Sequence, residues 1–341
     1  METRTKRILI WCVTAVIIVL MIIFIDFETI LINLQQISIT GIILFVLVYT
    51  IAFIFRALKL KLVFNGINTK PKYLSIYGSI GAGWAINELT PAKLGDLAKM
   101  EYIRQRESEI PLSKSLCAVL LDRFIDLIIL FSITCFTLIF IFVNGVYSST
   151  LNLDFFIIIG AAILLIGAFA LLLLFFKTEW VLMIIGKISK KLQYLLEKFV
   201  KRFVEGLKDL RQNPKLVLLT LLFNIPTWFF ESLTLVILFY LDEDLAVYQV
   251  DFFIIILAQM VTFFTKTIPI TPGGWGVSEG IGTGLVLLFY PSIPIDWILA
   301  VFILDHILRI IYVFIYGGTS IVAINFKFSK THIEKIRSQQ V

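Results

Sequence analysis

Two clusters of charged side chains interrupt apolar stretches of this chain and are its clearest candidates for chemistry. Each cluster mixes acidic and basic groups: Asp122, Arg123 and Asp126 in one, and Asp305, His306 and Arg309 in the other. A charge at the centre of a membrane helix costs on the order of 3 kcal/mol, so we expect these side chains to face the interior of a helix bundle. They then either line a polar path and contact a substrate, or form ion pairs that hold neighbouring segments in place.

A short motif, T-P-x-x-x-G, precedes each cluster. One copy runs from Thr90 to Gly95 and the other from Thr271 to Gly276. The first acid of the following cluster comes 32 residues after the threonine in one case and 34 in the other. Paired interruptions at matching places in two halves of a membrane protein indicate a transport site. The backbone positions that we assign to these turns are Thr90, Pro91, Gly95, Thr271, Pro272, Gly273, Gly274 and Gly276.

Basic residues near the motifs and in the clusters are candidates for binding an anion. We expect Lys93, Arg123 and Arg309 to attract a phosphate group. A helix that begins after Pro272 would also present free backbone N–H groups to an anion. Arg56 lies near the predicted end of its helix, so it either extends to the membrane surface or binds a phosphate.

Acidic residues near the motifs complete the candidate site. We expect Glu88, Asp96 and Glu279 to hold a cationic head group or to exchange protons. The acids of the clusters belong to the same candidate set of substrate-binding residues: Asp122, Asp126 and Asp305. Asp305 and Arg309 are four residues apart and Arg123 and Asp126 are three apart, so the members of each pair share a helix face.

The composition is that of a helical membrane protein. Of 341 residues, 59% are hydrophobic and 16% are charged, and the mean hydropathy is +0.95. We therefore predict an all-α polytopic membrane protein, with a single membrane domain over residues 1–341. About six full spans are predicted, near 8–25, 38–58, 116–143, 153–176, 214–241 and 297–325. Gly and Pro interrupt two further apolar stretches, 73–90 and 250–290.

The remaining composition narrows the range of partners and cofactors. The net charge of +6 fits the basic bias of cytoplasmic loops in membrane proteins, so no nucleic-acid partner is predicted. Three cysteines without a C-x-x-C pair, and only two histidines, predict no metal site. Nucleotide-binding motifs are not found in the sequence, so we expect no cofactor.

Basic residues in the loops predict how the chain crosses the membrane. They place both termini and the amphipathic linker 177–213 in the cytoplasm, and they assign Lys59, Lys61, Lys70 and Lys72 to a cytoplasmic loop. In this scheme 73–90 and 250–290 are re-entrant hairpins that enter from opposite sides. Residues 38–143 and 214–325 then form an inverted-topology repeat in the plasma membrane, with a binding site between its halves near the midplane.

The motifs together resemble the lysylphosphatidylglycerol synthase transmembrane-region family, the flippase-like module of the multiple peptide resistance factors. The similarity rests on Arg56 with Lys59, on the blocks Asn87–Asp96 and Leu121–Asp126, and on Pro269–Gly280, and it covers almost the whole chain. It implies movement of a lipid between leaflets, either an aminoacylated phospholipid or a polyprenyl-linked one. The full synthases carry a large aminoacyl-transferase domain after the membrane part. Here a short tail follows residue 325, so we expect no lysyl transfer by this chain.

Three hypotheses for function follow. The first is a lipid flippase or transporter whose partners are membrane lipids with an anionic phosphate head group, acting as a monomer or a homo-oligomer. The second is a membrane protein that does not transport and that supports a partner synthase or glycosyltransferase. The third is an intramembrane lipid-modifying enzyme, because Gly276–Gly280 fits the G-x-S-x-G pattern and Ser278, His306 and Asp305 could form a catalytic set.

Overall fold

The structure is a computed structural model that describes residues 38–90, 94–145, 162, 165–167, 169, 206–241, 243–267 and 271–324. Within these ranges the regular elements are all helices. Four of them are long and apolar enough to cross a membrane: α3 (Ile39–Gly66), α6 (Leu112–Asn144), α10 (Pro214–Leu241) and α14 (Ile295–Ala323). The prediction of an all-α polytopic membrane protein is therefore confirmed. The predicted spans 8–25 and 153–176, and most of the linker 177–213, lie outside the described residues.

The long helices begin and end where the local sequence favours it. Ser38 precedes α3, and its side-chain oxygen accepts a hydrogen bond from the Gly41 N–H at 3.1 Å, which is an N-cap contact. Pro111 and Pro294 stand immediately before α6 and α14, where a residue without an N–H is tolerated. Gly145 ends α6 in the left-handed region with φ 58°, a conformation that glycine adopts without a steric penalty.

Helix α3 continues beyond the predicted boundary at residue 58 as far as Gly66, and this overturns the assignment of Lys59 to a cytoplasmic loop. Lys59 is fully buried, and its ammonium group lies 2.9 Å from Asp122 and forms a second ion pair with Asp126. A lysine with two carboxylate partners can remain in the bundle, because the pairs offset the cost of removing its charge from water.

Two pairs of shorter helices lie between the long ones. The first pair is α4 (Tyr73–Leu89) and α5 (Gly95–Arg106), and the second is α12 (Phe252–Thr267) and α13 (Val277–Phe289). Each T-P-x-x-x-G motif lies at the junction within a pair, and the second junction contains the one-turn helix η1 (Pro272–Gly274). Three glycines there, at 273, 274 and 276, have positive φ values of 63°, 86° and 79°. The turn therefore depends on glycine at these positions.

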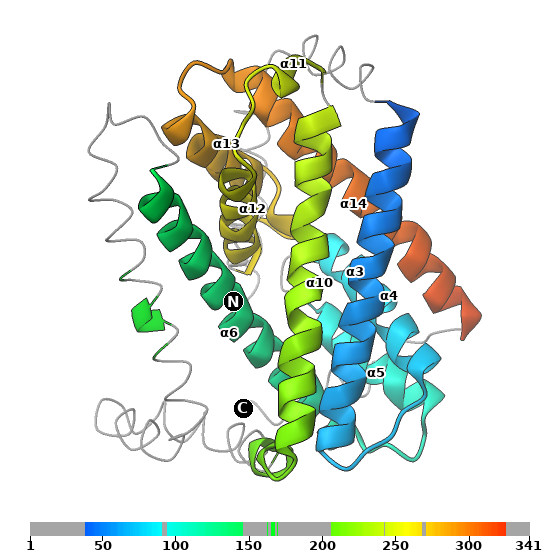
Figure 1. The fold of residues 1–341 in the computed structure, drawn as a ribbon. Helices are drawn as coiled ribbons and strands as arrows, with labels where there is room; N and C mark the ends of the chain where they lie inside the picture. Colours follow the sequence, from blue (N-terminus) through cyan, green and yellow to red (C-terminus); the bar gives the residue numbers. More distant parts are fainter. Residues whose placement is uncertain are drawn as a thin grey trace, which may run out of the picture.

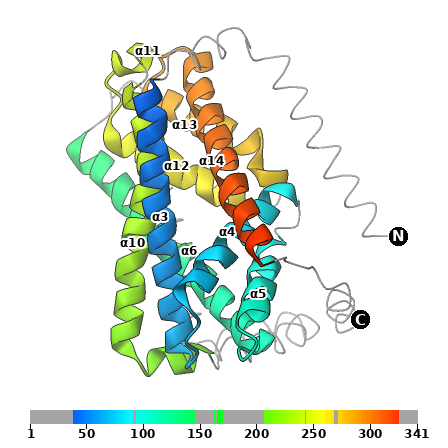
Figure 2. The same ribbon diagram turned by 90° about the vertical axis from the view of Figure 1, so that its right-hand side faces the viewer.

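The elements repeat in the order long, short, short, long. The lengths are 28, 17, 12 and 33 residues in the first half and 28, 16, 13 and 29 in the second. Helix α3 packs along α10, α4 packs against α14, and α12 packs against α6 (Figure 1). In the view of Figure 2, as in Figure 1, α4 and α5 lie toward one end of the α3–α10 pair, and α12 and α13 lie toward the other. A small helix, α11 (Glu243–Ala246), follows α10.

A close backbone contact holds the first short-helix pair together, and it leads to a stability prediction. A Cβ atom at Gly95 would lie 1.9 Å from the Gly83 carbonyl oxygen, whereas a Cβ at Gly280, on α13, would meet nothing within 4 Å. We expect Gly95→Ala to lower the unfolding free energy by about 1–3 kcal/mol through overpacking. The matched control Gly280→Ala should be neutral or slightly stabilising. Thermal unfolding of the purified variants in detergent measures both, and equal effects would contradict this account.

Candidate substrate-binding site

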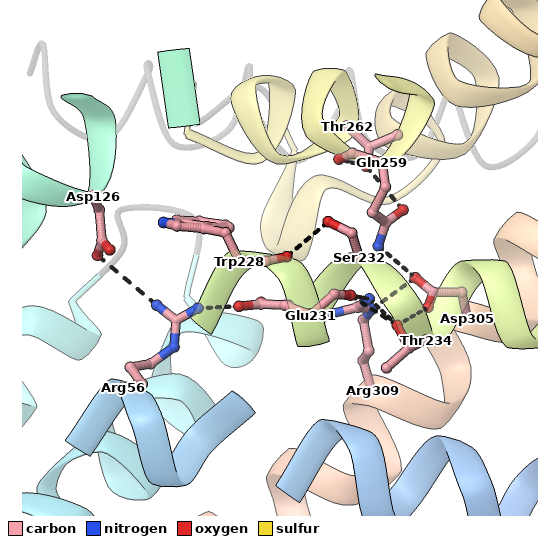
Figure 3. Close-up of polar contacts among 10 residues, drawn as sticks. All are labelled: Arg56, Asp126, Trp228, Glu231, Ser232, Thr234, Gln259, Thr262, Asp305 and Arg309. Atoms are coloured by element: carbon pink, nitrogen blue, oxygen red, sulfur yellow. Dashed lines mark hydrogen bonds and ion pairs between the residues drawn. The ribbon is translucent and has the colours of Figure 1, made fainter. Parts of the chain in front are cut away.

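A chain of buried ion pairs connects the four long helices (Figure 3). Arg56 on α3 pairs with Glu231 on α10, and its other amino group lies 3.9 Å from Asp126 on α6. Glu231 also lies 3.6 Å from Arg309 on α14, and Arg309 donates to Asp305 at 2.7 Å. Negative and positive groups therefore alternate along five side chains from four long helices. Such a chain stays in a membrane interior because each charge has an opposite neighbour on at least one side.

Polar groups of neighbouring helices support the Asp305 end of this chain. Arg309 donates to the Glu231 carbonyl oxygen at 2.7 Å and to the Thr234 hydroxyl. Gln259 on α12 donates to Asp305 at 3.3 Å, and the Thr234 oxygen lies 3.1 Å from the same carboxylate. The carboxylate is thus bonded from three helices, which fixes its orientation.

Aromatic rings cover both guanidinium groups. The Arg56 guanidinium carbon lies 4.9 Å from the Trp84 ring centre and 5.2 Å from that of Trp228. The Arg309 guanidinium carbon lies 4.8 Å from the Tyr49 ring and 5.3 Å from the Phe263 ring. Desolvated cation–π contacts of this kind contribute about 2 kcal/mol. They also exclude water from the ion pairs.

The ion pairs of the two halves correspond to one another with their charges reversed. Arg56 and Glu231 each stand 17 residues after the first residue of a 28-residue helix, Ile39 in α3 and Pro214 in α10. Arg56 pairs with an acid on the last long helix of its half, Asp126, and Glu231 approaches a base on the last long helix of the other half, Arg309. The halves therefore meet at their equivalent positions through one ion pair.

A second set of contacts corresponds in the same way and links each short-helix pair to the last long helix of its half. Arg123 on α6 binds Asp96 on α5 through two nitrogens, at 2.9 and 3.1 Å. His306 on α14 pairs through Nδ1 with Glu279 on α13. Both pairs join residues 27 positions apart, and both acids lie in the first turn of their helix.

Two neighbouring cations favour the ionised form of Asp96. Burial raises the pKa of the Asp96 carboxyl, but the Arg123 guanidinium and the Lys99 ammonium have the opposite effect and hold the pKa below its ordinary value. The Lys99 ammonium lies 3.1 Å from the carboxylate. Asp96 therefore acts as an acceptor at neutral pH.

A cavity of about 320 Å³ lies between the two halves, next to the ion-pair chain. Both T-P-x-x-x-G motifs reach it, through Thr90 on one side and Thr271, Gly273 and Gly274 on the other. Its apolar wall is largely aromatic and comes from α3, α4, α10 and α12: Tyr49, Trp84, Trp228 and Phe263. Charged groups from both halves share this wall, so the cavity has the lining of a site for a polar ligand.

Several buried polar atoms at the cavity have no hydrogen-bond partner among the described residues. They are Trp84 Nε1, Glu88 Oε2, Asp126 Oδ2, Trp228 Nε1, Glu231 Oε1, His306 Nε2 and Arg309 Nη1. Buried polar atoms in proteins are nearly always bonded, and each exception needs an explanation. A polar ligand that accepts from the indoles and from Arg309, and donates to the carboxylates, would satisfy them.

The predicted site residues fall into two groups in the structure, those that line the cavity and those that are buried away from it. Five of them line the cavity: Glu88, Asp96, Arg123, Asp126 and Arg309. Four others are buried behind the wall and pair with other charged residues: Arg56, Asp122, Glu279 and Asp305. Lys93 and Pro91 lie outside the described residues. The expectation that Arg56 extends to the membrane surface is wrong, because its side chain is 2% exposed and paired with Glu231.

Arg123 and Asp126 share a helix but not a partner. Arg123 turns to Asp96, whereas Asp126 pairs with Lys59 and approaches Arg56. Asp96, which is distant in sequence, accepts two parallel hydrogen bonds from the Arg123 guanidinium. This contact is stronger than a single ion pair with Asp126 on the same helix would be.

Sequence reasoning missed two charged residues that line the cavity, Glu231 and Lys266. Each was detectable as the one charge in a long uncharged run: Glu231 between Lys215 and Asp242, and Lys266 between Asp251 and Glu279. Lys266 lies in the last turn of α12, and no ion pair joins it to another residue in the described part of the chain. A half-buried lysine that lines a cavity without an ion-pair partner is a candidate for binding an anion.

The geometry around Ser278 bears on the hydrolase hypothesis. The Ser278 hydroxyl lies 3.0 Å from both the Gly274 carbonyl oxygen and the Glu279 carboxylate. No hydrogen bond connects it to His306 within the described residues, because His306 Nδ1 is occupied by Glu279. Ser278 is buried, and it is not among the residues that line the cavity. A nucleophile must reach its substrate, so these contacts do not favour a serine-dependent reaction here.

Comparison with known proteins identifies relatives of the chain. Residues 10–317 match the sequence profile of the lysylphosphatidylglycerol synthase TM region. The chain is also similar to the UPF0104 membrane protein MJ1078 of Methanocaldococcus jannaschii, with 29% identity over 194 residues, which cover 57% of this chain and 75% of the relative. No solved structure gives a significant match to the chain.

Proposed function

Because the chain belongs to the lysylphosphatidylglycerol synthase transmembrane-region family, we propose that it is a lipid transporter. It would move a phospholipid or a polyprenyl-linked lipid with an anionic head group between the two leaflets of the plasma membrane, with both termini in the cytoplasm. One observation carries this proposal: a polar cavity lies between the two halves, where both turn motifs meet. Transporters built from internal repeats bind their substrates at such a place.

The charges of the cavity indicate the class of head group. Lys266, Arg123 and Arg309 line it and would attract a phosphate, and the indole N–H groups of Trp84 and Trp228 would donate to its oxygens. Opposite charges line the same wall, so a head group that also carries an amine would find partners there. A zwitterionic or aminoacylated lipid therefore fits the proposal as well as an anionic one.

The internal correspondence of the fold supports transport by exchange between two states. We propose that residues 38–143 and 214–325 are inverted repeats and that α4–α5 and α12–α13 are re-entrant hairpins. The equal order of elements, the reversed pairing of Arg56 and Glu231, and the positions of the short helices at opposite ends of α3 and α10 all support this assignment. In such folds the halves exchange conformations around a fixed site, which opens it to one side at a time.

The proposal assigns no catalytic step to this chain, and it differs in a measurable way from a role as a non-transporting partner of a synthase or glycosyltransferase. A scaffold would purify with its enzyme and leave lipids in their original leaflet. A transporter would move lipids when it is the sole protein in a vesicle, as a monomer or a homo-oligomer.

Removal of the lysine in the cavity tests the proposal. In vesicles of phosphatidylethanolamine and phosphatidylglycerol that contain fluorescently labelled phosphatidylglycerol, we expect Lys266→Gln to slow movement of the label between leaflets by about tenfold or more, because a charge-assisted contact contributes roughly 1.5–3 kcal/mol. The matched control Lys215→Gln removes an exposed lysine at the start of α10 and should retain the wild-type rate. If the wild-type protein moves no label, or if both variants behave alike, transport through this cavity is wrong.

A further inference from the structure

Three side chains form a buried cluster that connects the two short-helix pairs. His306 on α14 pairs through Nδ1 with Glu279, in the first turn of α13, directly after the second motif. Its other ring nitrogen, Nε2, points to Glu88, in the last turn of α4, directly before the first motif. The His306 side chain is 3% exposed and that of Glu88 is 15% exposed. The imidazole therefore lies between two carboxylates that belong to different halves of the fold.

The two sides of the imidazole are not equivalent. Glu279 is a direct hydrogen-bond partner, whereas Glu88 Oε2 lies 3.9 Å from Nε2, beyond hydrogen-bond distance. Nε2 and Glu88 Oε2 are also unbonded to any other described residue. A carboxylate can only accept, so the contact with Glu279 places a proton on Nδ1 and leaves a lone pair on Nε2 of the neutral ring.

We propose that Glu88, His306 and Glu279 form a proton-binding site that couples proton uptake to the relative position of the two short-helix pairs. A hydronium ion that reaches the cavity would transfer its proton to Nε2: one O–H bond breaks, one N–H bond forms, and a water molecule is left. The ring becomes an imidazolium that donates through Nδ1 to Glu279 and through Nε2 to Glu88. The charge of the three groups changes from −2 to −1, and release of the proton to water reverses the step.

The groups around the His306 ring would stabilise one positive charge on it. The Trp275 ring stacks on the imidazole, with centroids 4.4 Å apart and 16° between planes, and an indole face stabilises a cation. The other charged groups that line the cavity with His306, or adjoin it in sequence, come from five helices: Lys266, Asp96, Arg123, Asp126, Glu231, Arg309 and Asp305. The two arginines among them are paired with Asp96 and Asp305. Lys266 is then the cation that opposes protonation and keeps it reversible.

Protonation has a mechanical consequence because Glu88 touches the other half. A Cβ at Gly273 would lie 2.5 Å from Glu88 Oε2, so the carboxylate rests against the backbone of the second motif. Closing the 3.9 Å gap to Nε2 would move the end of α4 toward α14 and η1, against which α4 already packs. Uptake of a proton would therefore draw the two motifs together, and its loss would release them. This inference rests on the proposed transport function for its biological meaning, but not for its test.

The experiment measures the protonation state of the His306 imidazole directly. The chain has two histidines, so His332→Gln leaves His306 as the one histidine, and ¹⁵N-histidine labelling with solid-state NMR in phosphatidylglycerol–phosphatidylethanolamine vesicles reports its protonation. We expect a neutral ring with the proton on Nδ1 at high pH, and an imidazolium that donates through both nitrogens at low pH. Glu88→Gln should lower the fraction of imidazolium severalfold at the same pH, because it removes the carboxylate that lies 3.9 Å from Nε2. Asp296→Asn removes a half-buried acid in the first turn of α14 that does not line the cavity, and it should leave that fraction unchanged.

Three results would overturn the proposal: a ring that stays neutral throughout, a neutral ring with its proton on Nε2, or a fraction of imidazolium that Glu88→Gln does not lower. In transport, the ratio of label movement with and without an imposed pH gradient should exceed one for the wild type and fall to one for Glu88→Gln. Because the NMR measurement needs no substrate, it decides the proton site even if labelled phosphatidylglycerol is not moved. Failure of transport and failure of the proton site are thus separate outcomes.

Discussion

Glu231→Gln is expected to destabilise the protein by about 3–5 kcal/mol, the range measured when one member of a buried ion pair is removed. Glu231 is 1% exposed, pairs with Arg56 and approaches Arg309 at 3.6 Å. Its neutralisation leaves Arg56 with the more distant Asp126, at 3.9 Å, as its remaining carboxylate partner among the described residues. Chemical unfolding of the purified variant in mixed micelles measures the loss.

Two double variants distinguish a continuous chain of charges from an isolated pair. Arg56→Met with Glu231→Met removes both charges and leaves Arg309 with Asp305 and Asp126 with Lys59, so stability should return close to that of the wild type. The exchange Arg56→Glu with Glu231→Arg should not restore it, because each new charge would face a like charge, Asp126 or Arg309. If the exchanged protein is as stable as the wild type, the alternation of charges is not what holds these helices together.

The sequence contained enough to place most of the site, because apolar surroundings make charges conspicuous. The two clusters and the two motifs were located by type and spacing, and the structure brings five of the predicted side chains to one cavity. Which of those side chains form ion pairs with one another could not be predicted from the sequence. Arg56 and Glu231 are 175 residues apart, and nothing local indicates that they meet. A distant partner decides whether an intramembrane charge faces a ligand or a counter-ion.

Lys59 shows why the predicted end of α3, at residue 58, was wrong. Counting bases assumes that a lysine near the end of an apolar run marks a loop in water. Lys59 instead lies inside the bundle, one helical turn after Arg56, because α6 supplies Asp122 and Asp126. The cost of burying the ammonium group is offset by partners that appear only after folding. Helix ends that are predicted from the positions of basic residues are therefore least reliable beside a candidate site, because charged side chains are buried there in ion pairs.

The reversed charges of the two halves suggest why this arrangement suits a mobile structure. If both halves carried the same charge at equivalent positions, like charges would meet where α3 and α10 pack together. Arg56 in one half and Glu231 in the other convert that repulsion into an ion pair. Each member of the pair also has a second partner: Asp126 lies 3.9 Å from Arg56, and Arg309 lies 3.6 Å from Glu231. A small movement of one half could lengthen one contact and shorten another without leaving a charge unpaired.

Arg123→Ala is expected to reduce lipid movement by on the order of 100-fold while the protein remains folded, because loss of one member of a hydrogen-bonded charge pair at a binding site costs roughly 2–5 kcal/mol. The Arg123 side chain lines the cavity and is 32% exposed, so its charge is partly hydrated and its removal costs less stability than that of a fully buried charge. The rate of leaflet exchange of labelled phosphatidylglycerol and the thermal unfolding temperature are measured on the same preparation.

Arg123→Lys and Arg104→Ala complete the test. Lysine keeps the positive charge but cannot reproduce the two parallel hydrogen bonds to Asp96, at 2.9 and 3.1 Å, so its rate should lie between those of the alanine variant and the wild type. Arg104 also pairs with an acid, Glu101, and its side chain is 36% exposed, but it lies outside the cavity wall. Arg104→Ala should therefore move lipid at the wild-type rate. A wild-type rate in Arg123→Ala, or an equal loss in both alanine variants, would show that the guanidinium at the cavity does not bind the transported head group.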